Sequence, residues 1–446
     1  MSTQLKSYPA YKDSGVPWLA EIPAHWEVDR LKKHARNVVE LTGERVGEEI
    51  YLALEHVESW TGRLRPSAPD ATFDSQVKRF RADDVLFGKL RPYLAKITRP
   101  EQDGVCVGEF LVLRPQTPDL ASRYLEHLLR SKPVIDAINS STFGAKMPRA
   151  DWQFVGNMTV ALPPLPEQRA IARYLDHVDR RIRRVIHAKQ KLIALLDEQK
   201  QAVIHQAVTR GLDPNVRLKP SGVAWLGEVP EHWEVKQLGR FITLQRGFDI
   251  TKEQQTAGSI PVVSSGGISS YHNQATSAGP GVIVGRKGSA GTVYYVGGVY
   301  WAHDTTLWVK EFNSNAPKYV YYVLTNMDLK RFDTGSANPT INRNIVHPEL
   351  IAFPPPEEQR RIAIVLDHLL EQTDQMIGTL LRQISLLREY RTRLIADVVT
   401  GKVDVRAAAQ GLPEEVDELE PLGEVEAPAE DEEGIELTEE DEETGG

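Results

Sequence analysis

The chain has 446 residues, of which 41% are hydrophobic and 26% charged, which is typical of a soluble globular protein with roughly two to four domains. No run of the sequence approaches the roughly 18 consecutive apolar residues of a membrane span, and residues 1–15 lack the apolar stretch of a secretory signal. The single cysteine, Cys106, excludes disulfide frameworks and thiolate metal sites within one chain. These features predict a cytoplasmic protein that has no membrane segment and binds no metal.

The net charge of −9 conceals two regions of opposite charge. Residues 414–446 contain 17 Asp and Glu and no Lys or Arg, so the rest of the chain has 53 Lys and Arg against 45 Asp and Glu, a net charge of +8. The basic body can bind phosphates. The acidic end has too few apolar residues to fold alone, which predicts a disordered tail over 406–446. A partner-binding or DNA-mimicking role for this tail stays open.

Two motifs occur twice and in the same order, which identifies the chain as a tandem duplication. The first, here named the Trp motif, is GVPWLAEIPAHWEV at 15–28 and GVAWLGEVPEHWEV at 222–235, an offset of 207. The second, named the Pro motif, is PPLPEQR at 163–169 and PPPEEQR at 354–360, an offset of 191. The frame of the molecule is therefore repeated.

The variable regions between the motifs, 30–160 and 237–351, share little sequence. Both contain strand-like runs and shorter helical patterns, which predict mixed α/β folds. One similarity is VLFGK at 85–89 against IVGRK at 283–287, at an offset between those of the two motifs. A repeated frame with different regions inside it predicts two different working surfaces on the same support.

A long helix is predicted after each Pro motif, because prolines suit the first helical turn and apolar residues then recur at alternating spacings of four and three. The pattern extends over about five heptads, and Gly211 and Gly401 are stop signals. The second variable region joins the end of the first helix to the start of the second. A parallel pair would require it to span about 60 Å. We therefore predict an antiparallel pair with an internal pseudo-two-fold axis, whose length sets the separation of the variable regions.

The predicted fold class is α+β, with two globular α/β domains alternating with two long helices that form an intramolecular coiled coil. The predicted parts are a first globular domain, a central long helix, a second globular domain, a distal long helix and the acidic tail. Their boundaries are 1–162, 163–211, 212–353, 354–405 and 406–446.

Candidate DNA-binding residues lie in polar segments of each variable region. Glycines allow close approach to a phosphate, while Arg and Lys neutralise phosphates or pair with guanine. Two further loops, 140–149 and 334–343, mix small, amide and hydroxyl side chains with Arg. Ordinary surface turns are the alternative explanation of all these segments. The candidates are Lys89, Arg91, Tyr93, Lys146, Arg149, Arg286, Lys287, Ser289, Asn338, Asn342 and Arg343.

Catalytic signatures are missing from the sequence. It has no GxxxxGK followed by Ser or Thr, no HExxH, no GxSxG and no Asn/Asp-Pro-Pro motif that ends in an aromatic residue. His303 and Asp304 are adjacent, and adjacent residues on a strand point to opposite faces, so a structural role is predicted for them. The sequence therefore predicts a chain with no catalytic residues and no cofactor of its own.

The repeated frame resembles the specificity (S) subunit family of type I restriction-modification systems, from about Tyr8 to Asp404. The resemblance implies a non-catalytic subunit that binds a bipartite, asymmetric target in double-stranded DNA. Each variable region would be a target-recognition domain for one half-site, and the helices would set the unread spacer. The residues that carry it are Trp18, Pro23, His25 and Trp26, their repeats Trp225, Pro230, His232 and Trp233, and both Pro motifs.

The resemblance also implies partners. Methyltransferase (M) subunits and restriction (R) subunits would assemble with the chain, and S-adenosylmethionine, ATP and magnesium would bind to those partners. The long helices would be the docking surface for the methyltransferase, while the acidic tail departs from the family pattern. The docking candidates are Glu167, Gln168, Arg169, Glu358, Gln359 and Arg360.

Two other classes of function stay open at this stage. A protein-binding scaffold could use the same repeated frame, but its apolar interfaces would resist salt, whereas DNA binding weakens steeply as salt rises. A self-sufficient enzyme of unrecognised type would show nuclease or methyltransferase activity as an isolated chain.

Overall fold

The computed structural model describes residues 5–65, 76–142, 147–333 and 340–413. The chain forms two compact units: unit 1 comprises 1–190 with 382–446, and unit 2 comprises 191–381. Each unit therefore contains one globular α/β part together with a portion of each long helix. Within the ranges that the structure describes, no helix is both long and apolar enough to cross a membrane.

The described residues of unit 1 form two four-stranded sheets and two strand pairs. The first sheet has the order β4 (Ala35–Val38), β11 (Phe110–Pro115), β8 (Val85–Gly88) and β9 (Ile97–Thr98). The second has the order β5 (Leu41–Thr42), β7 (Val77–Phe80), β10 (Gly104–Cys106) and β6 (Ile50–Leu52). The pairs are β1 (Tyr11–Asp13) with β2 (Glu21–Pro23), and β3 (Glu27–Arg30) with β12 (Thr159–Leu162).

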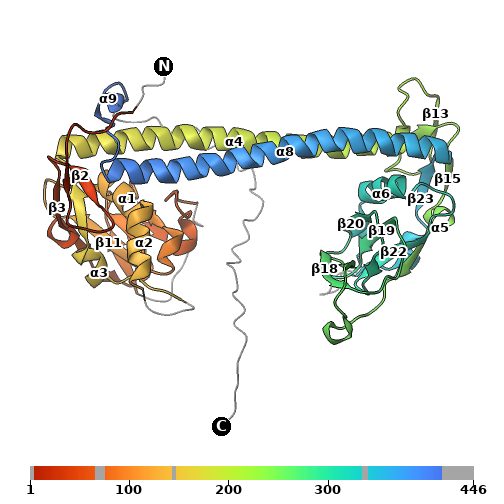
Figure 1. The fold of residues 1–446 in the computed structure, drawn as a ribbon, viewed down its shortest axis with the longest axis horizontal. Helices are drawn as coiled ribbons and strands as arrows, with labels where there is room; N and C mark the ends of the chain where they lie inside the picture. Colours follow the sequence, from red (N-terminus) through yellow and green to blue (C-terminus); the bar gives the residue numbers. More distant parts are fainter. Residues whose placement is uncertain (1–4, 66–75, 143–146, 334–339, 414–446) are drawn as a thin grey trace, which may run out of the picture. The chain divides into compact units, whose positions relative to one another are not determined.

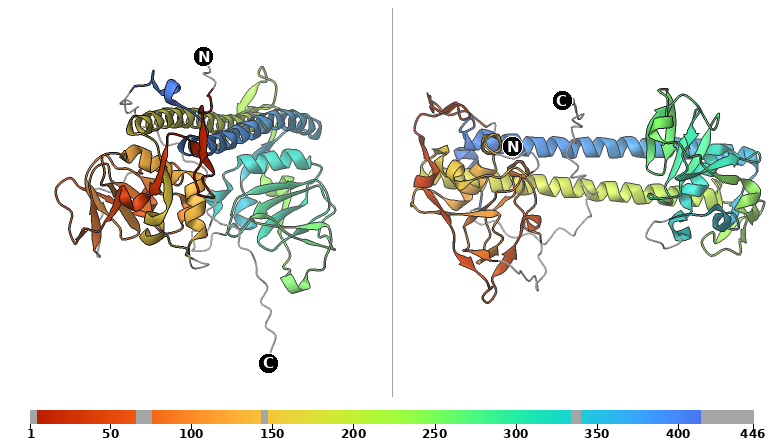
Figure 2. Two further views of the ribbon diagram at one scale, coloured as in Figure 1. Left: turned by 60° about the vertical axis from the view of Figure 1, so that its left-hand side comes forward. Right: turned by 90° about the horizontal axis from the view of Figure 1, so that it is seen from below.

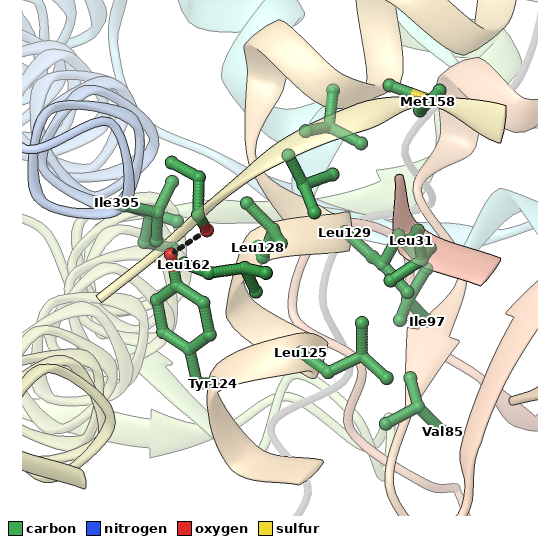
Figure 3. Close-up of a cluster of buried hydrophobic side chains, with 14 of the residues drawn as sticks. Leu31, Val85, Ile97, Tyr124, Leu125, Leu128, Leu129, Met158, Leu162 and Ile395 are labelled. Carbon is green, nitrogen blue, oxygen red and sulfur yellow. Dashed lines mark hydrogen bonds between the residues drawn. The ribbon is translucent and has the colours of Figure 1, made fainter. Parts of the chain in front are cut away.

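Short helices cover the first sheet of unit 1, and α1 packs on β8 and β9. Figure 3 shows the core that they enclose, in which Leu125, Leu128 and Leu129 of α1 meet Val85 and other buried apolar side chains. The hydroxyl of Tyr124 donates to the carbonyl of Ala161 at 3.0 Å, which ties α1 to β12. The helices are α1 (Ser122–Arg130), α2 (Lys132–Ser140), α3 (Trp152–Asn157), η1 (Leu31–Lys33), η2 (Leu54–His56) and η3 (Pro92–Leu94).

Unit 2 repeats the first sheet and carries a smaller second one. The first has the order β16 (Thr243–Arg246), β22 (Thr306–Glu311), β19 (Gly281–Gly285) and β20 (Val293–Val296). The second has the order β18 (Gly267–His272), β17 (Ile260–Ser264) and β21 (Trp301–Ala302). The pairs are β13 (Leu218–Pro220) with β14 (Glu228–Pro230), and β15 (Glu234–Gln237) with β23 (Leu350–Phe353).

One helix of unit 2 occupies the place that α1 has in unit 1. Helix α6 packs on β19 and β20, as α1 packs on β8 and β9. The two variable regions thus share one sheet order and one helix placement although their sequences differ. The helices are α5 (Leu238–Phe241), α6 (Pro317–Asn326), α7 (Arg343–Val346), η4 (Lys252–Gln254) and η5 (Leu329–Phe332).

The central strand of each first sheet is buried on both faces. In β8, Val85 and Phe87 join the main core of unit 1, while Leu86 points to a second core between the two sheets. In β19, Val284 joins the main core of unit 2 and Ile283 the smaller one. Successive side chains of a strand point to opposite faces, so both positions must be apolar. This double burial explains the continuous apolar runs in the one segment that the variable regions share.

The long helices are α4 (Leu165–Arg210) and α8 (Pro356–Val399), and a short α9 (Arg406–Ala409) follows. In each unit, α4 and α8 lie side by side (Figure 1, Figure 2). In unit 1, Asp179 pairs with Arg391 at 3.7 Å, and Lys189 donates to Gln383 further along α4. As the α4 number rises, the α8 number falls. The prediction of an antiparallel pair is confirmed within unit 1.

Unit 2 shows the same sense of pairing. Lys200 of α4 forms an ion pair with Asp374 of α8. Further along α4, Val208 shares a core with Ile362 and Leu366 near the start of α8. The prediction of an antiparallel pair is therefore confirmed in this unit as well.

A glutamate carboxylate ties each Trp motif to its Pro motif, and in unit 1 this carboxylate is buried. The indole of Trp26 donates to Glu167 Oε1 at 3.0 Å, and His25 Nε2 lies 2.8 Å from Glu167 Oε2. The hydroxyl of Tyr8 donates to the same carboxylate at 2.6 Å. Burial and Glu167 raise the pKa of Tyr8, which keeps its proton in place for this bond. Trp26 has no exposed surface, so its N–H depends on this acceptor.

Unit 2 contains the same arrangement. Trp233 donates to Glu358 Oε1 at 3.2 Å, and His232 Nε2 lies 2.8 Å from Glu358 Oε2. The Glu358 side chain is 31% exposed, against 6% for Glu167. The repeated motifs thus form one repeated structural joint.

The glutamine of each Pro motif holds the helix that packs on the first sheet of the globular part. Gln168 Oε1 accepts the backbone N–H of Ala121 at 2.9 Å, just before α1, and its Nε2 donates to Asp119 and Pro163 carbonyls. Gln359 Oε1 likewise accepts the N–H of Ala316, just before α6, at 2.8 Å. Each glutamine satisfies an N–H that the helix itself leaves unpaired.

A third joint lies two turns further along each long helix. Asp176 of α4 contacts His127 Nε2 at 2.7 Å and forms an ion pair with Arg123. Burial alone would raise the pKa of Asp176, but His127 and Arg123 outweigh it and hold the pKa below its usual value. In unit 2, Asp367 accepts from Tyr322 and pairs with Lys318 at 3.1 Å.

These joints correct part of the predicted docking surface. Glu167, Gln168 and Gln359 are buried, with 6%, 0% and 1% of their surface exposed, and their polar atoms bind within the chain. A partner cannot reach them in this conformation. Glu358 is half-buried against Trp233. Exposed Arg169 and Arg360 stay candidates for docking.

The first prediction concerns the joint in unit 1. Replacing Glu167→Leu removes the acceptor of Trp26 and Tyr8 and leaves buried donors unpaired, so the free energy of unfolding should fall by about 2–4 kcal/mol. Denaturant titration followed by tryptophan fluorescence measures this change. Arg169→Leu, an exposed neighbour, is the control and should cost no more than about 0.5 kcal/mol. A loss equal to that of the control would contradict the joint.

Candidate nucleic-acid interface

The structure brings two predicted loops of unit 1 together. Lys89 follows β8, and its carbonyl accepts the N–H of Ala150 at 2.9 Å. The N–H of Arg91 donates to the carbonyl of Pro148 at 2.9 Å, and Leu90 and Arg149 form a β-bridge. The loop after β8 therefore lies against the loop before α3, which places both sets of predicted residues on one surface.

Unit 2 holds the corresponding loops in the same way. The carbonyl of Arg286, which follows β19, accepts the N–H of Ile341 at 3.0 Å. Lys287 and Thr340 form a β-bridge, just before α7. Lys89 and Arg286 thus occupy equivalent positions although their side chains differ.

A neighbouring segment supports each of these basic residues from the other side. The N–H of Lys89 donates to the carbonyl of Glu109, and that of Arg286 to the carbonyl of Thr305, both at 2.8 Å. His303 Nδ1 lies 3.0 Å from Thr305 Oγ1 and shapes the turn before β22. His303 therefore has structural contacts, but the expectation that His303 and Asp304 point to opposite faces of a strand is wrong, because they lie at a turn and their side chains are 3.2 Å apart.

The loops after β8 and before α3 carry charged and aromatic side chains on the surface of unit 1. Arg91 has a left-handed backbone, with φ of +49°, at the start of η3. Within η3, Tyr93 is 44% exposed. Arg149 is 61% exposed and pairs with Glu109 at 3.0 Å. An exposed pair of this kind is weak, so Arg149 can exchange Glu109 for a phosphate.

Unit 2 has a hollow of about 920 Å³ at the equivalent place. Arg246 pairs with Asp304 at 2.8 Å across it, and Arg286 Nη1 donates to the carbonyl of Asp304 at 3.3 Å. Burial lowers the pKa of Arg286, and the nearby Arg246 lowers it further, while Asp304 opposes both. The hollow thus crowds two guanidinium groups. It is lined by Gln245, Arg246, Gly247, Phe248, Asp249, Arg286, Asp304, Leu307, Thr340, Asn342 and Arg343.

The predicted residues contribute to this surface unequally. Lys287 and Ser289 are exposed beside the hollow. Asn342 Oδ1 caps α7 by accepting the N–H of Asn344 at 3.0 Å, which leaves its amide N–H groups for a ligand. Arg343 Nη1 donates to the carbonyl of Leu244 at 3.3 Å. Lys146 and Asn338 lie outside the described residues.

The sequence-based candidates include only Arg286, Asn342 and Arg343 of the residues that line the hollow. Among the residues that were missed, Arg246 ends β16, which hydrogen-bonds to β22, and Phe248 and Asp249 lie just after it. Phe248 is 42% exposed. The pattern QRGF at 245–248, a basic residue and a glycine at the end of a strand, resembles the basic segment after β19 and was the available signal.

A group of acidic and imidazole side chains lies beside the hollow. Ligand atoms of Asp249, His303 and Asp304 lie within 4.8 Å of one another. The Asp304 carboxylate is already paired with Arg246, and His303 lies 3.2 Å from that carboxylate. Arg246 and His303 hold the pKa of Asp304 below its usual value against the effect of burial, which raises it. This group keeps Asp304 ionised as an acceptor facing the hollow.

Comparisons with known proteins agree with the fold. The chain is similar to the type I restriction enzyme EcoDI specificity subunit of Escherichia coli, with 25% identity over 178 residues that cover 38% of this chain and 39% of that protein. It is also similar to the MjaVIII specificity subunit of Methanocaldococcus jannaschii, with 28% identity over 144 residues and 32% of each chain covered. The matches thus span less than half the length of either relative.

A solved structure has the same fold. This structure comes from a study of the structural basis of complex assembly and conformational transition of the type I R-M system. Its TM-score is 0.68 at 18% identity, over 85% of this chain and 98% of that chain.

The sequence model of one family matches both halves of the chain. It is described as the type I restriction modification DNA specificity domain, and it matches residues 95–194 and 230–386, together more than half of the chain. Both matches run from a variable region into a long helix. The chain therefore belongs to the family of type I restriction modification DNA specificity domains and contains that domain twice.

Proposed function

We propose that this chain is the DNA-specificity subunit of a type I restriction-modification complex. It binds a bipartite, asymmetric target in double-stranded DNA and directs methyltransferase and restriction subunits to it. The observation that carries the proposal is that both family domains place basic loops at equivalent positions, with different side chains on them. Loops that have the same backbone position but different side chains suit the recognition of two different half-sites.

The chemistry of the two surfaces fits DNA. Arginine pairs with guanine through two hydrogen bonds, lysine binds phosphates, and the amide of asparagine pairs with adenine. Unit 1 offers Lys89, Arg91 and Arg149, with Tyr93 as an apolar contact. Unit 2 offers the hollow with Arg246, Arg286, Asn342 and Arg343. Asp304 adds an acceptor for the amino group of cytosine.

Catalysis belongs to the partners in this proposal. S-adenosylmethionine, ATP and magnesium bind to the methyltransferase and restriction subunits, and the chain itself contributes recognition. Exposed Arg169 and Arg360, at the starts of the long helices, are available for docking the methyltransferase. Because its substrate is cellular or incoming DNA, we place the complex in the cytoplasm.

The second prediction tests one contact residue. In the complex with methyltransferase subunits, Arg286→Gln should weaken binding of the target by about 1–3 kcal/mol and relax the preference at one base pair of one half-site. Fluorescence anisotropy with the target and with single-base variants measures both effects. Lys310→Gln, at the far end of β22, is the matched control and should leave the affinity unchanged. Equal affinities in wild type and Arg286→Gln would remove Arg286 from the interface.

The third prediction tests whether the two readers are independent. Replacing residues 237–351 by the equivalent region of another family member should change one half of the methylated sequence and leave the other intact. The repeated joints at Trp233 and Glu358 stay in place in this exchange. Sequencing of methylated bases in DNA from cells that express the complex identifies both halves. A change of both halves would contradict independent reading.

The fourth prediction concerns the spacer, which stays a prediction from the sequence. Lys189 of α4 contacts Gln383 of α8, so seven residues inserted after each of these positions add one paired heptad. The added length is about 10 Å, and the unread spacer should grow by about three base pairs. Methylated-base sequencing again reads the result. An unchanged spacer would contradict the role of the helices in setting it.

A further inference from the structure

A long groove in unit 1 lies apart from the loops assigned to DNA. Its volume is about 1730 Å³, and it separates the globular part from α4 and α8. The helices line it with residues between 176 and 190 and between 385 and 392. The globular part lines it with residues between 58 and 64, between 98 and 102, and between 123 and 132, among others.

The groove is rich in arginine. It is lined by ten Arg or Lys and seven Asp or Glu. Six of the seven acidic side chains form ion pairs within the part of the chain that the structure describes; Asp179, for example, pairs with Arg183 and Arg391, at 2.9 and 3.7 Å. Arg63 and Arg184 form no ion pair with any residue that the structure describes. The groove therefore has an excess of positive charge that its own carboxylates do not neutralise.

Two buried guanidinium groups intensify this excess. Arg130 is 6% exposed, and its Nε has no hydrogen-bond partner among the described residues. Arg391 is 8% exposed. Burial lowers the pKa of Arg391, Asp179 opposes this, and the neighbouring Arg130 and Arg183 lower the pKa further. Crowded, incompletely paired arginines favour an anionic ligand, because a buried donor left unpaired costs free energy.

The second copy does not repeat this charge. At the offset of the Pro motifs, Arg180 corresponds to Glu371 and Arg184 to Gln375. The joints on the same helices are repeated, so this difference lies outside the frame. A contact made with DNA at both half-sites would be expected in both copies. At these two positions only unit 1 is basic, so we expect the ligand of the groove to bind unit 1.

The described chain ends in unit 1, close to the arginines of α4. Val405 is fully buried in the core of this unit, and Arg406 lies over the ring of Tyr8 at 5.0 Å. The carbonyl of Leu412 accepts a hydrogen bond from Arg173 at 3.5 Å. Arg173, Arg180 and Arg184 follow one another at i, i+7 and i+11, so they lie on one face of α4.

We propose that the acidic segment 414–446 is an intramolecular ligand of this groove. The segment carries 17 carboxylates and no basic side chain, which complements the excess of arginine. Arg184 lies about 16 Å along α4 from Arg173, whereas 33 extended residues reach roughly 100 Å. The tail therefore begins near the groove and is long enough to follow it. While bound, it withholds the groove from other polyanions, nucleic acid included.

A labelled peptide with the sequence 414–446 tests the proposal by fluorescence anisotropy. It should bind the chain truncated after Pro413, and the affinity should fall as salt rises. The full chain should bind the peptide about tenfold more weakly, because a tethered tail at millimolar effective concentration competes with a peptide whose Kd is about 100 µM. Truncation leaves every described residue of both main cores in place.

Variants of the truncated chain locate the site. Arg180→Glu with Arg184→Gln should weaken peptide binding at least about tenfold. These residue types stand at 371 and 375 of the other copy, so a long helix of this fold accepts them. Arg360→Glu with Arg361→Gln makes the same change of charge at an exposed place in unit 2 and should have less than about a twofold effect.

Three outcomes would overturn the proposal. One is the absence of peptide binding to the truncated chain, and another is equal peptide affinity for the truncated and full chains. The third is equal loss in the groove variant and its control. If a DNA duplex of unrelated sequence lost affinity in the groove variant while the peptide did not bind, the groove would serve DNA instead of the tail. None of these outcomes depends on the target sequence or on the methyltransferase.

Discussion

The constraint on which the rest of the structure depends is the buried carboxylate of Glu167. It accepts the indole of Trp26 and the hydroxyl of Tyr8 at the point where the globular part meets the first turn of α4. A buried carboxylate is tolerated only when its oxygens are paired, and a buried indole only when its N–H has an acceptor. The Glu167 carboxylate and the Trp26 indole can therefore both be buried because each satisfies the hydrogen bond that the other needs. Glu358 and Trp233 repeat the joint, so each globular part is fixed to its long helix in the same way, whatever contact residues it carries.

Local and periodic features could be predicted from the sequence. The predicted helix segments 163–211 and 354–405 compare with α4 at Leu165–Arg210 and α8 at Pro356–Val399. The heptad pattern and the prolines that begin each helix are local features of the sequence. The connectivity of the chain favoured the antiparallel arrangement. The second predicted segment is too long, because α8 ends at Val399, shortly before Gly401, whose φ is +79°. The residues beyond it return to the core of unit 1 through Val405.

Non-local features could not be predicted in the same way. Arg246 and Phe248 enter the hollow only because β16 pairs with β22, about 60 residues later in the chain. The common sheet order of the two variable regions was also hidden. Double burial of β8 and β19 requires apolar residues without requiring particular ones, so the fold persists while the sequence changes. Gln168 was misassigned for a related reason: its repetition in both copies reflects a bond to the N–H of Ala121, and not an exposed surface.

The two copies can therefore be separated into what the fold requires and what it leaves free. The joints recur at Glu167 and Glu358, at Gln168 and Gln359, and at Asp176 and Asp367. Positions in the basic loops and in the groove of unit 1 differ: Lys89 stands where the other copy has Arg286, and Arg180 where it has Glu371. Since both copies fold with either residue, stability does not dictate these differences. In a duplicated protein, positions that have the same place in the fold but different side chains in the two copies are the ones that give each copy its own function.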